Sequence, residues 1–160
     1  MSHTVDAQQK TKLSITLNKL VLLTFLLMIA YFGYGRYEAH KAEQAQASVL
    51  ILTPQINDIY FLDMRLLGDT LERKHKYKLA KVVRVSGDNI AIVYGRFSYQ
   101  WQYSVVNSIQ HGDLSNNDYF KLIPDYISLS KIKEMKKNEV IYLVKRPIQN
   151  KLYGGLVSLR

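Results

Sequence analysis

An uncharged apolar segment close to the N-terminus constrains this chain more than any other feature. Residues 20–34 read LVLLTFLLMIAYFGY, and extending the segment back to Leu13 adds only one charge. A helix over residues 13–35 would be about 34 Å long, which is enough to cross a hydrocarbon core of roughly 30 Å. Several tyrosines lie at its C-terminal end, as aromatic residues do at a membrane interface. The segment therefore predicts a transmembrane helix at residues 13–35.

Two other interpretations of this segment compete with a retained anchor. A buried core helix is disfavoured because the apolar residues cover every face and leave no polar stripe. A cleaved signal sequence has some support, since Ala45-Gln46-Ala47 has the small-x-small form of a cleavage site. However, cleavage sites lie close behind the apolar core, and here a charged stretch from Arg36 to Glu43 intervenes. We therefore expect an uncleaved signal anchor and a single-pass membrane protein.

The charges that flank the predicted span indicate its orientation. Lys10, Lys12 and Lys19 lie on the N-terminal side, against Arg36 and Lys41 on the other side. Basic residues near a span favour the cytoplasm. We therefore expect an inner (plasma) membrane location, with a cytoplasmic N-terminus and an extracytoplasmic C-terminal domain.

The rest of the chain divides into a stalk and one domain. Residues 36–48 read RYEAHKAEQAQAS and are rich in good helix formers, and Pro54 ends this stretch. We expect a short tail at 1–12, the span at 13–35, a helical stalk and linker at 36–54, and a small β-rich domain at 55–160. Three lysines and one aspartate precede Arg36, so +7 of the net charge of +9 lies from Arg36 onward. Such a basic domain favours anionic neighbours.

Residues 77–94 carry the clearest strand pattern. Tyr77, Leu79, Val83 and Val85 alternate with Lys78, Ala80, Val82 and Arg84, which predicts a half-buried strand. Residues 86–89 read SGDN, a tight turn, and residues 90–94 form the return strand. The stretch KYKLAKVVRVSGDNIAIVYGRFSY is similar in pattern to SH3-like or Tudor-like small barrels. This resemblance covers about 40 residues, rests on hairpin spacing alone and implies no function.

Further elements complete the expected fold. Strands are predicted at 59–64, at 139–145 and, at the edge, at 156–159, and Ser128 precedes a helical LSKIKEMKK segment. Residues 101–111 remain open between strand and short helix. The predicted fold class is a single N-terminal transmembrane helix plus a small mainly-β (α+β) domain, with an SH3-like small barrel and one or two short helices as its finer form.

The sequence contains no constellation that predicts catalysis. The absence of cysteine excludes disulfides, zinc–thiolate sites and thiol chemistry. None of the four histidines has a partner at a metal-binding spacing, and no phosphate loop or nucleophile elbow is present. We therefore expect no enzyme activity, no metal, no cofactor and no small-molecule substrate.

Two sets of residues are candidate contacts. The first is basic and fits an anionic membrane surface, although such a run is more often a solvated face; it comprises Arg73, Lys74, Lys76 and Lys78. The second is aromatic and fits a partner protein or nucleic-acid bases, although a lone Trp is more often part of a core; it comprises Tyr99, Trp101 and Tyr103.

These features predict a membrane-anchored interaction or assembly module of the cell envelope. A scaffold or accessory subunit of a secretion, pilus or transfer apparatus, or a membrane-bound immunity protein, would have this organisation. Its expected partners are the lipid bilayer and another envelope protein. The alternative is a membrane-tethered, nucleic-acid-binding small barrel that faces the cytoplasm, which the predicted orientation disfavours.

Overall fold

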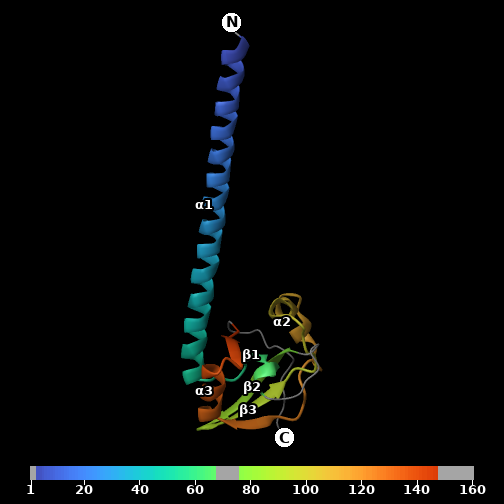
Figure 1. The fold of residues 1–160 in the computed structure, drawn as a ribbon. Helices are drawn as coiled ribbons and strands as arrows, with labels where there is room; N and C mark the ends of the chain where they lie inside the picture. The colour runs from blue at the N-terminus through green and yellow to red at the C-terminus, as the bar shows by residue number, and fades with distance from the viewer. Residues whose placement is uncertain (1–2, 68–75, 148–160) are drawn as a thin grey trace. The chain divides into compact units, whose positions relative to one another are not determined.

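A computed structural model describes the backbone of residues 3–67 and 76–147, and the side chains from residue 18 onward within these ranges (Figure 1). One long helix precedes a domain of strands and short helices. The elements are α1 (His3–Leu52), β1 (Ile59–Asp63), η1 (Met64–Leu67), β2 (Tyr77–Ser86), β3 (Asn89–Tyr94), α2 (Gln102–Gln110), η2 (Asp113–Ser115), β4 (Asp125–Ser128), α3 (Leu129–Lys137) and β5 (Ile141–Lys145).

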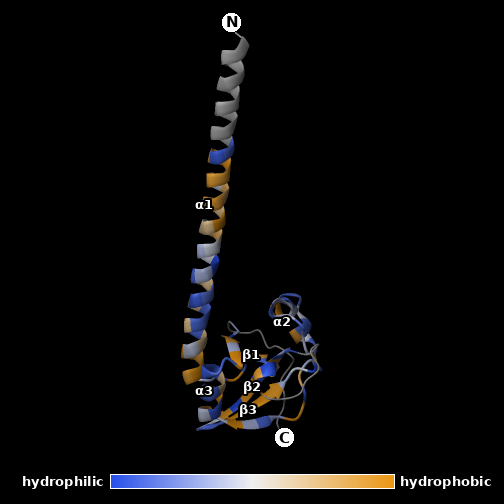
Figure 2. Cartoon of the chain, in the orientation of Figure 1, coloured by the Kyte–Doolittle hydropathy of each residue, from blue (hydrophilic) through white to orange (hydrophobic). Residues whose placement is uncertain are grey.

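Helix α1 contains the predicted span. Its side chains from residue 18 to residue 43 are exposed, and Figure 2 shows a hydrophobic section followed by a polar one. Residues 18–52 are long and apolar enough to cross a membrane, and the same properties fit a signal sequence near an N-terminus. The helix continues without a break through the predicted stalk to Leu52. The chain divides into two compact units at residues 42 and 43, so the last ten residues of α1 belong to the second unit, the domain.

The domain is built on a five-stranded antiparallel sheet with the strand order β4-β3-β2-β1-β5. The sheet is open, because β4 and β5 form its two edges and do not pair with each other among the described strands. The finer prediction of an SH3-like small barrel is therefore wrong for the described part of the chain. Hairpin spacing is shared by barrels and open meanders, whereas closure depends on pairing between distant strands.

One face of the sheet packs against helices. Tyr60, Leu62, Ala80, Val82 and other apolar residues of the sheet meet Ala47 and Ile51 of α1 and Ile132 and Met135 of α3. Helix α3 begins at Ser128, whose hydroxyl oxygen accepts a hydrogen bond from the backbone N–H of Lys131 at 3.2 Å, as predicted for an N-cap. This layer fastens the last turns of α1 to the sheet.

The opposite face of the sheet is also covered. Phe61, Leu79 and Val93 of the strands pack against Val105 of α2 and against Tyr119 in the segment that follows η2. Residues 101–111, which the sequence left open, are mainly the helix α2. The central strands are consequently buried on both sides, as in a three-layer domain.

This double burial corrects the prediction for β2. Ala80 and Val82, placed on the polar face, are fully buried, whereas Val85 is 37% exposed. The register shifts between Val82 and Arg84 at a bulge, so Val83 no longer continues the alternation.

Lys81 of β2 is also buried, with its Nζ 4.9 Å from the centroid of the Phe120 ring. Burial lowers the pKa of this amine.

The other local predictions have mixed outcomes. The turn between β2 and β3 is confirmed, with Gly87 at a φ of 57°, and so are the strands that became β1 and β5. Strand β4 was not predicted. The expected edge strand at 156–159 lies outside the described residues.

The two ends of the sheet have different neighbours. At the first, the side chain of Gln44 in α1 donates from Nε2 to the Tyr142 carbonyl oxygen at 2.7 Å, where β5 begins. We call this the Gln44 end; β1 finishes there and β2 starts there. At the opposite end lie the turn between β2 and β3 and the start of α3, and we call it the hairpin end.

Candidate functional site

A lysine and a tryptophan from the two predicted sets meet at the Gln44 end. Lys76 directly precedes β2, and its backbone N–H donates to the Tyr99 carbonyl oxygen at 3.1 Å. Trp101 occupies the position immediately before α2. These placements put the Lys76 Nζ atom 5.7 Å from the centroid of the Trp101 ring, within the range of a cation–π contact. No local pattern in the sequence predicts this contact, because the two residues come from different elements.

The three candidate aromatic residues lie in different environments. Trp101 is 50% exposed and Tyr103, in the first turn of α2, is 63% exposed. Tyr99 is half-buried, and its hydroxyl lies 2.7 Å from the hydroxyl of the buried Tyr119. The aromatic residues at positions 97, 99, 101 and 103 alternate in the sequence as in a strand, but the start of α2 at Gln102 interrupts this pattern. Trp101 and Tyr103 are accessible to a ligand, whereas Tyr99 contributes to the core.

The candidate basic residues are placed only in part. Arg73 and Lys74 lie outside the described residues. Lys78 is half-buried in β2, and burial together with the neighbouring charge of Lys121 lowers its pKa. Lys121 is exposed, and its backbone N–H donates to the Tyr94 carbonyl oxygen at 2.9 Å. Like charges therefore gather at the Gln44 end, although the sequence had not singled out Lys121.

The acid buried at this end already has a basic partner. Asp63, at the end of β1, accepts a hydrogen bond at Oδ1 from the Arg65 Nε at 2.8 Å, and Arg65 also donates to the Tyr77 hydroxyl at 2.9 Å. Burial alone would raise the pKa of Asp63, but the hydrogen bonds from Arg65 outweigh it and hold the pKa below its ordinary value. Arg65 is therefore the main partner of Asp63, and the positive charge of Lys76 acts in the same direction to a smaller extent.

A second exposed surface runs along the β4 edge, and the sequence analysis missed it. Phe120 forms an isolated β-bridge with Gly95, and Asp125 of β4 pairs with Ile92 of β3. Between these two pairings, the edge segment contains two more residues than the segment of β3 beside it. The extra length falls around Leu122 and Ile123, which are 69% and 81% exposed. Tyr126 of β4 is 64% exposed. We call these three side chains the β4 edge patch.

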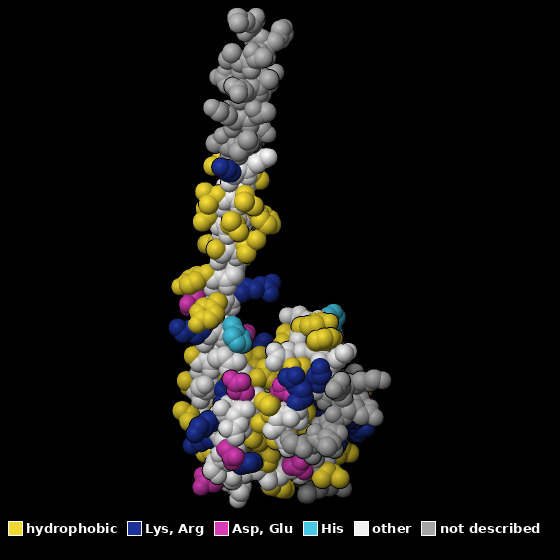
Figure 3. Space-filling view, in the orientation of Figure 1, with side chains coloured by type: hydrophobic (Ala, Val, Ile, Leu, Met, Phe, Trp, Pro, Cys, Tyr) yellow, Lys and Arg dark blue, Asp and Glu magenta, His cyan; other side chains and the backbone are white. Residues whose placement is uncertain are grey.

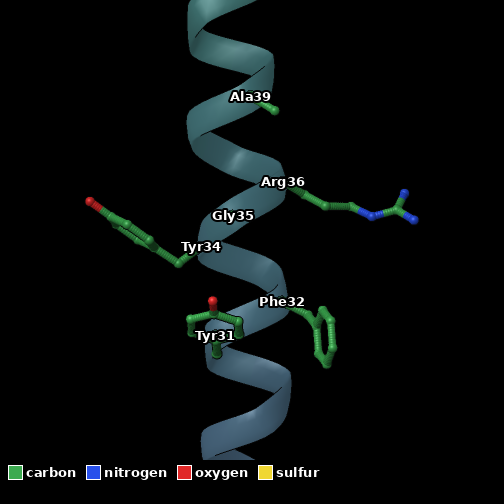
Figure 4. A pocket seen from close by; sticks show the side chains of 6 residues that line it. All are labelled: Tyr31, Phe32, Tyr34, Gly35, Arg36 and Ala39. Carbon is green, nitrogen blue, oxygen red and sulfur yellow. The ribbon is translucent and has the colours of Figure 1, made fainter.

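A hollow on α1 does not enclose a ligand. It is lined by Tyr31, Phe32, Tyr34, Gly35, Arg36 and Ala39, all from one helix. Figure 4 shows the Tyr34 side chain on the opposite side of the helix from Phe32 and Arg36. Aromatic rings followed by an arginine at the end of an apolar helical section are typical of the membrane interface. We therefore assign this hollow no binding role.

The part of the chain that the structure describes holds no group of three or more His, Cys, Asp or Glu side chains arranged for a metal ion. The expectation that the protein lacks a cofactor and enzyme activity stays a prediction. Comparisons with models of known protein families, with curated proteins and with solved structures gave no match to this chain.

Proposed function

We propose that this protein is a single-pass, membrane-anchored, non-catalytic interaction module of the cell envelope, with its domain on the extracytoplasmic side. Two features support this function. The side chains of the apolar section of α1 are exposed at every position from residue 18 to residue 35, which suits contact with lipid. The helix then continues directly into a folded domain that leaves apolar side chains unburied.

The β4 edge patch is the observation that carries this proposal. The other sheet edge is partly covered, because the Gln44 side chain of α1 donates a hydrogen bond to the backbone carbonyl oxygen of Tyr142 in β5. At the β4 edge, by contrast, Leu122, Ile123 and Tyr126 are all more than 60% exposed within five residues. Exposed apolar side chains that are grouped along one edge favour contact with another protein. Strand β4 is short and follows Pro124, so side chains rather than an added strand would make the contact.

In vivo photo-crosslinking tests the proposal directly. A photoreactive phenylalanine analogue replaces Ile123 or Tyr126 in the full chain, and Lys133, an exposed residue of α3, provides the control position. We expect one discrete adduct with an envelope protein at 123 and 126, and none at 133. The adduct at Tyr126 should disappear when Leu122 and Ile123 are changed to Asp, because charged residues are depleted from interface cores. No discrete adduct at either edge position, or the same adduct at all three, would contradict the proposal.

A further inference from the structure

The Gln44 end of the domain is the end at which the chain arrives from the membrane helix. Gln44 contacts Tyr142, the Tyr142 and Tyr77 rings lie 5.7 Å apart, and the backbone N–H of Tyr77 donates to the Tyr99 carbonyl oxygen at 2.9 Å. Trp101 follows Tyr99 by two residues in the sequence. The far end of α1 lies at the other end of β1, where the Thr53 carbonyl oxygen accepts from Arg146 at 2.8 Å. Gln44, Lys76 and Trp101 therefore share one end of the sheet.

Chain length limits how far this end can lie from the bilayer. The apolar section ends near Gly35, and the domain begins at Glu43. Eight residues span at most about 30 Å even when fully extended, and less than half of that when helical. Whatever the angle between the two units, the Gln44 end is thus tethered close to the bilayer surface.

The side chains exposed at this end have the chemistry of a lipid interface. Trp and Tyr combine an apolar ring with a polar group and concentrate at the level of the headgroups, and here Trp101 and Tyr103 are both accessible. Lys76 lies over Trp101, and Lys121 lies close enough to Lys78 for their charges to repel each other. Figure 3 shows that hydrophobic and basic side chains both reach the visible surface of the domain.

We propose that the Gln44 end of the domain docks onto the anionic headgroups of the same bilayer that α1 spans. Trp101 and Tyr103 enter the interfacial layer, and Lys76 and Lys121 contact lipid phosphates. This inference rests on the proposed function in one respect, the retention of α1 as an anchor. It leaves the β4 edge patch free to bind a protein.

Trp101 is the only tryptophan of the chain and therefore reports on its own environment. The full-length protein is placed in nanodiscs of phosphatidylcholine alone or of phosphatidylcholine with phosphatidylglycerol, and quenching by lipids brominated near the headgroup is measured. We expect a blue-shifted Trp101 emission and strong quenching in the anionic discs only. Because each lysine near an anionic surface changes the equilibrium about fivefold, the variant K76Q/K121Q should shift docking by about 25-fold toward the undocked state, and added salt should act in the same direction.

The charge-matched control removes two basic residues near the hairpin end. The variant R84Q/K131Q should retain the quenching, since both side chains are exposed away from the Gln44 end. Equal quenching in neutral and anionic discs, or equal losses in the two double variants, would overturn the proposal. So would a Trp101 that stays exposed in anionic discs and becomes shielded only when a protein partner is added. A chain that fails to insert into discs would instead count against the anchor, and so against the proposed function.

Discussion

At the scale of single residues, one buried ion pair ties three elements of the domain together. Asp58 is fully buried just before β1, and its carboxylate accepts from Arg146 Nε at 2.7 Å and from the Gln55 backbone N–H at 2.8 Å. Arg146, which follows β5, also donates to the carbonyl oxygen of Thr53 just past α1. The pair therefore holds the end of α1, the start of β1 and the end of β5 in one place.

Breaking this pair should be more damaging than replacing it. Arg146→Gln leaves the buried Asp58 carboxylate without its cation, which should cost about 2–3 kcal/mol of the free energy of unfolding, since Arg146 is partly exposed. The double variant Asp58→Asn/Arg146→Gln removes both charges and should lose less than the single one. Thermal unfolding of the full chain in detergent, followed by near-ultraviolet circular dichroism, measures the difference. Single and double variants that are both as stable as the parent would show that the pair contributes nothing.

At the scale of elements, the sequence was informative wherever a signal is local. The hairpin turn at Gly87 and the Ser128 cap of α3 follow from residue types that favour those conformations. By contrast, β4 escaped prediction because the strand is short and mostly exposed, with no alternating apolar face. The burial of both faces of β2, and the meeting of Lys76 with Trp101, depend on helices and loops distant in the sequence.

The burial of β2 makes a sharp prediction about two valines. Val82 is fully buried between the sheet and its helices, so Val82→Asp should cost more than about 3 kcal/mol by burying an unpaired charge. Val85, beyond the bulge and 37% exposed, provides the matched control, and Val85→Asp should cost less than about 1 kcal/mol. Chemical denaturation of the two variants compares them directly. Equal losses, or a larger loss for Val85→Asp, would mean that the register of β2 is different.

At the scale of the whole molecule, we propose a separate role for each part of the surface. In this proposal the apolar section of α1 is the anchor, and the Gln44 end, with Trp101 and Lys76, faces the lipid. The β4 edge patch remains available for a protein partner. These roles are separable by experiment, because the substitutions that test lipid docking and those that test partner binding lie on different elements.

Protease accessibility in spheroplasts tests directly whether α1 is retained as an anchor and whether the domain is extracytoplasmic. The full chain carries one tag at each end, and protease is added outside the intact inner membrane. We expect an uncleaved chain in the membrane fraction, from which external protease removes the C-terminal tag while the N-terminal tag stays protected. A shorter chain released in soluble form would identify a cleaved signal sequence, and a protected C-terminal tag would place the domain in the cytoplasm. Either result would contradict an extracytoplasmic domain held by a retained anchor.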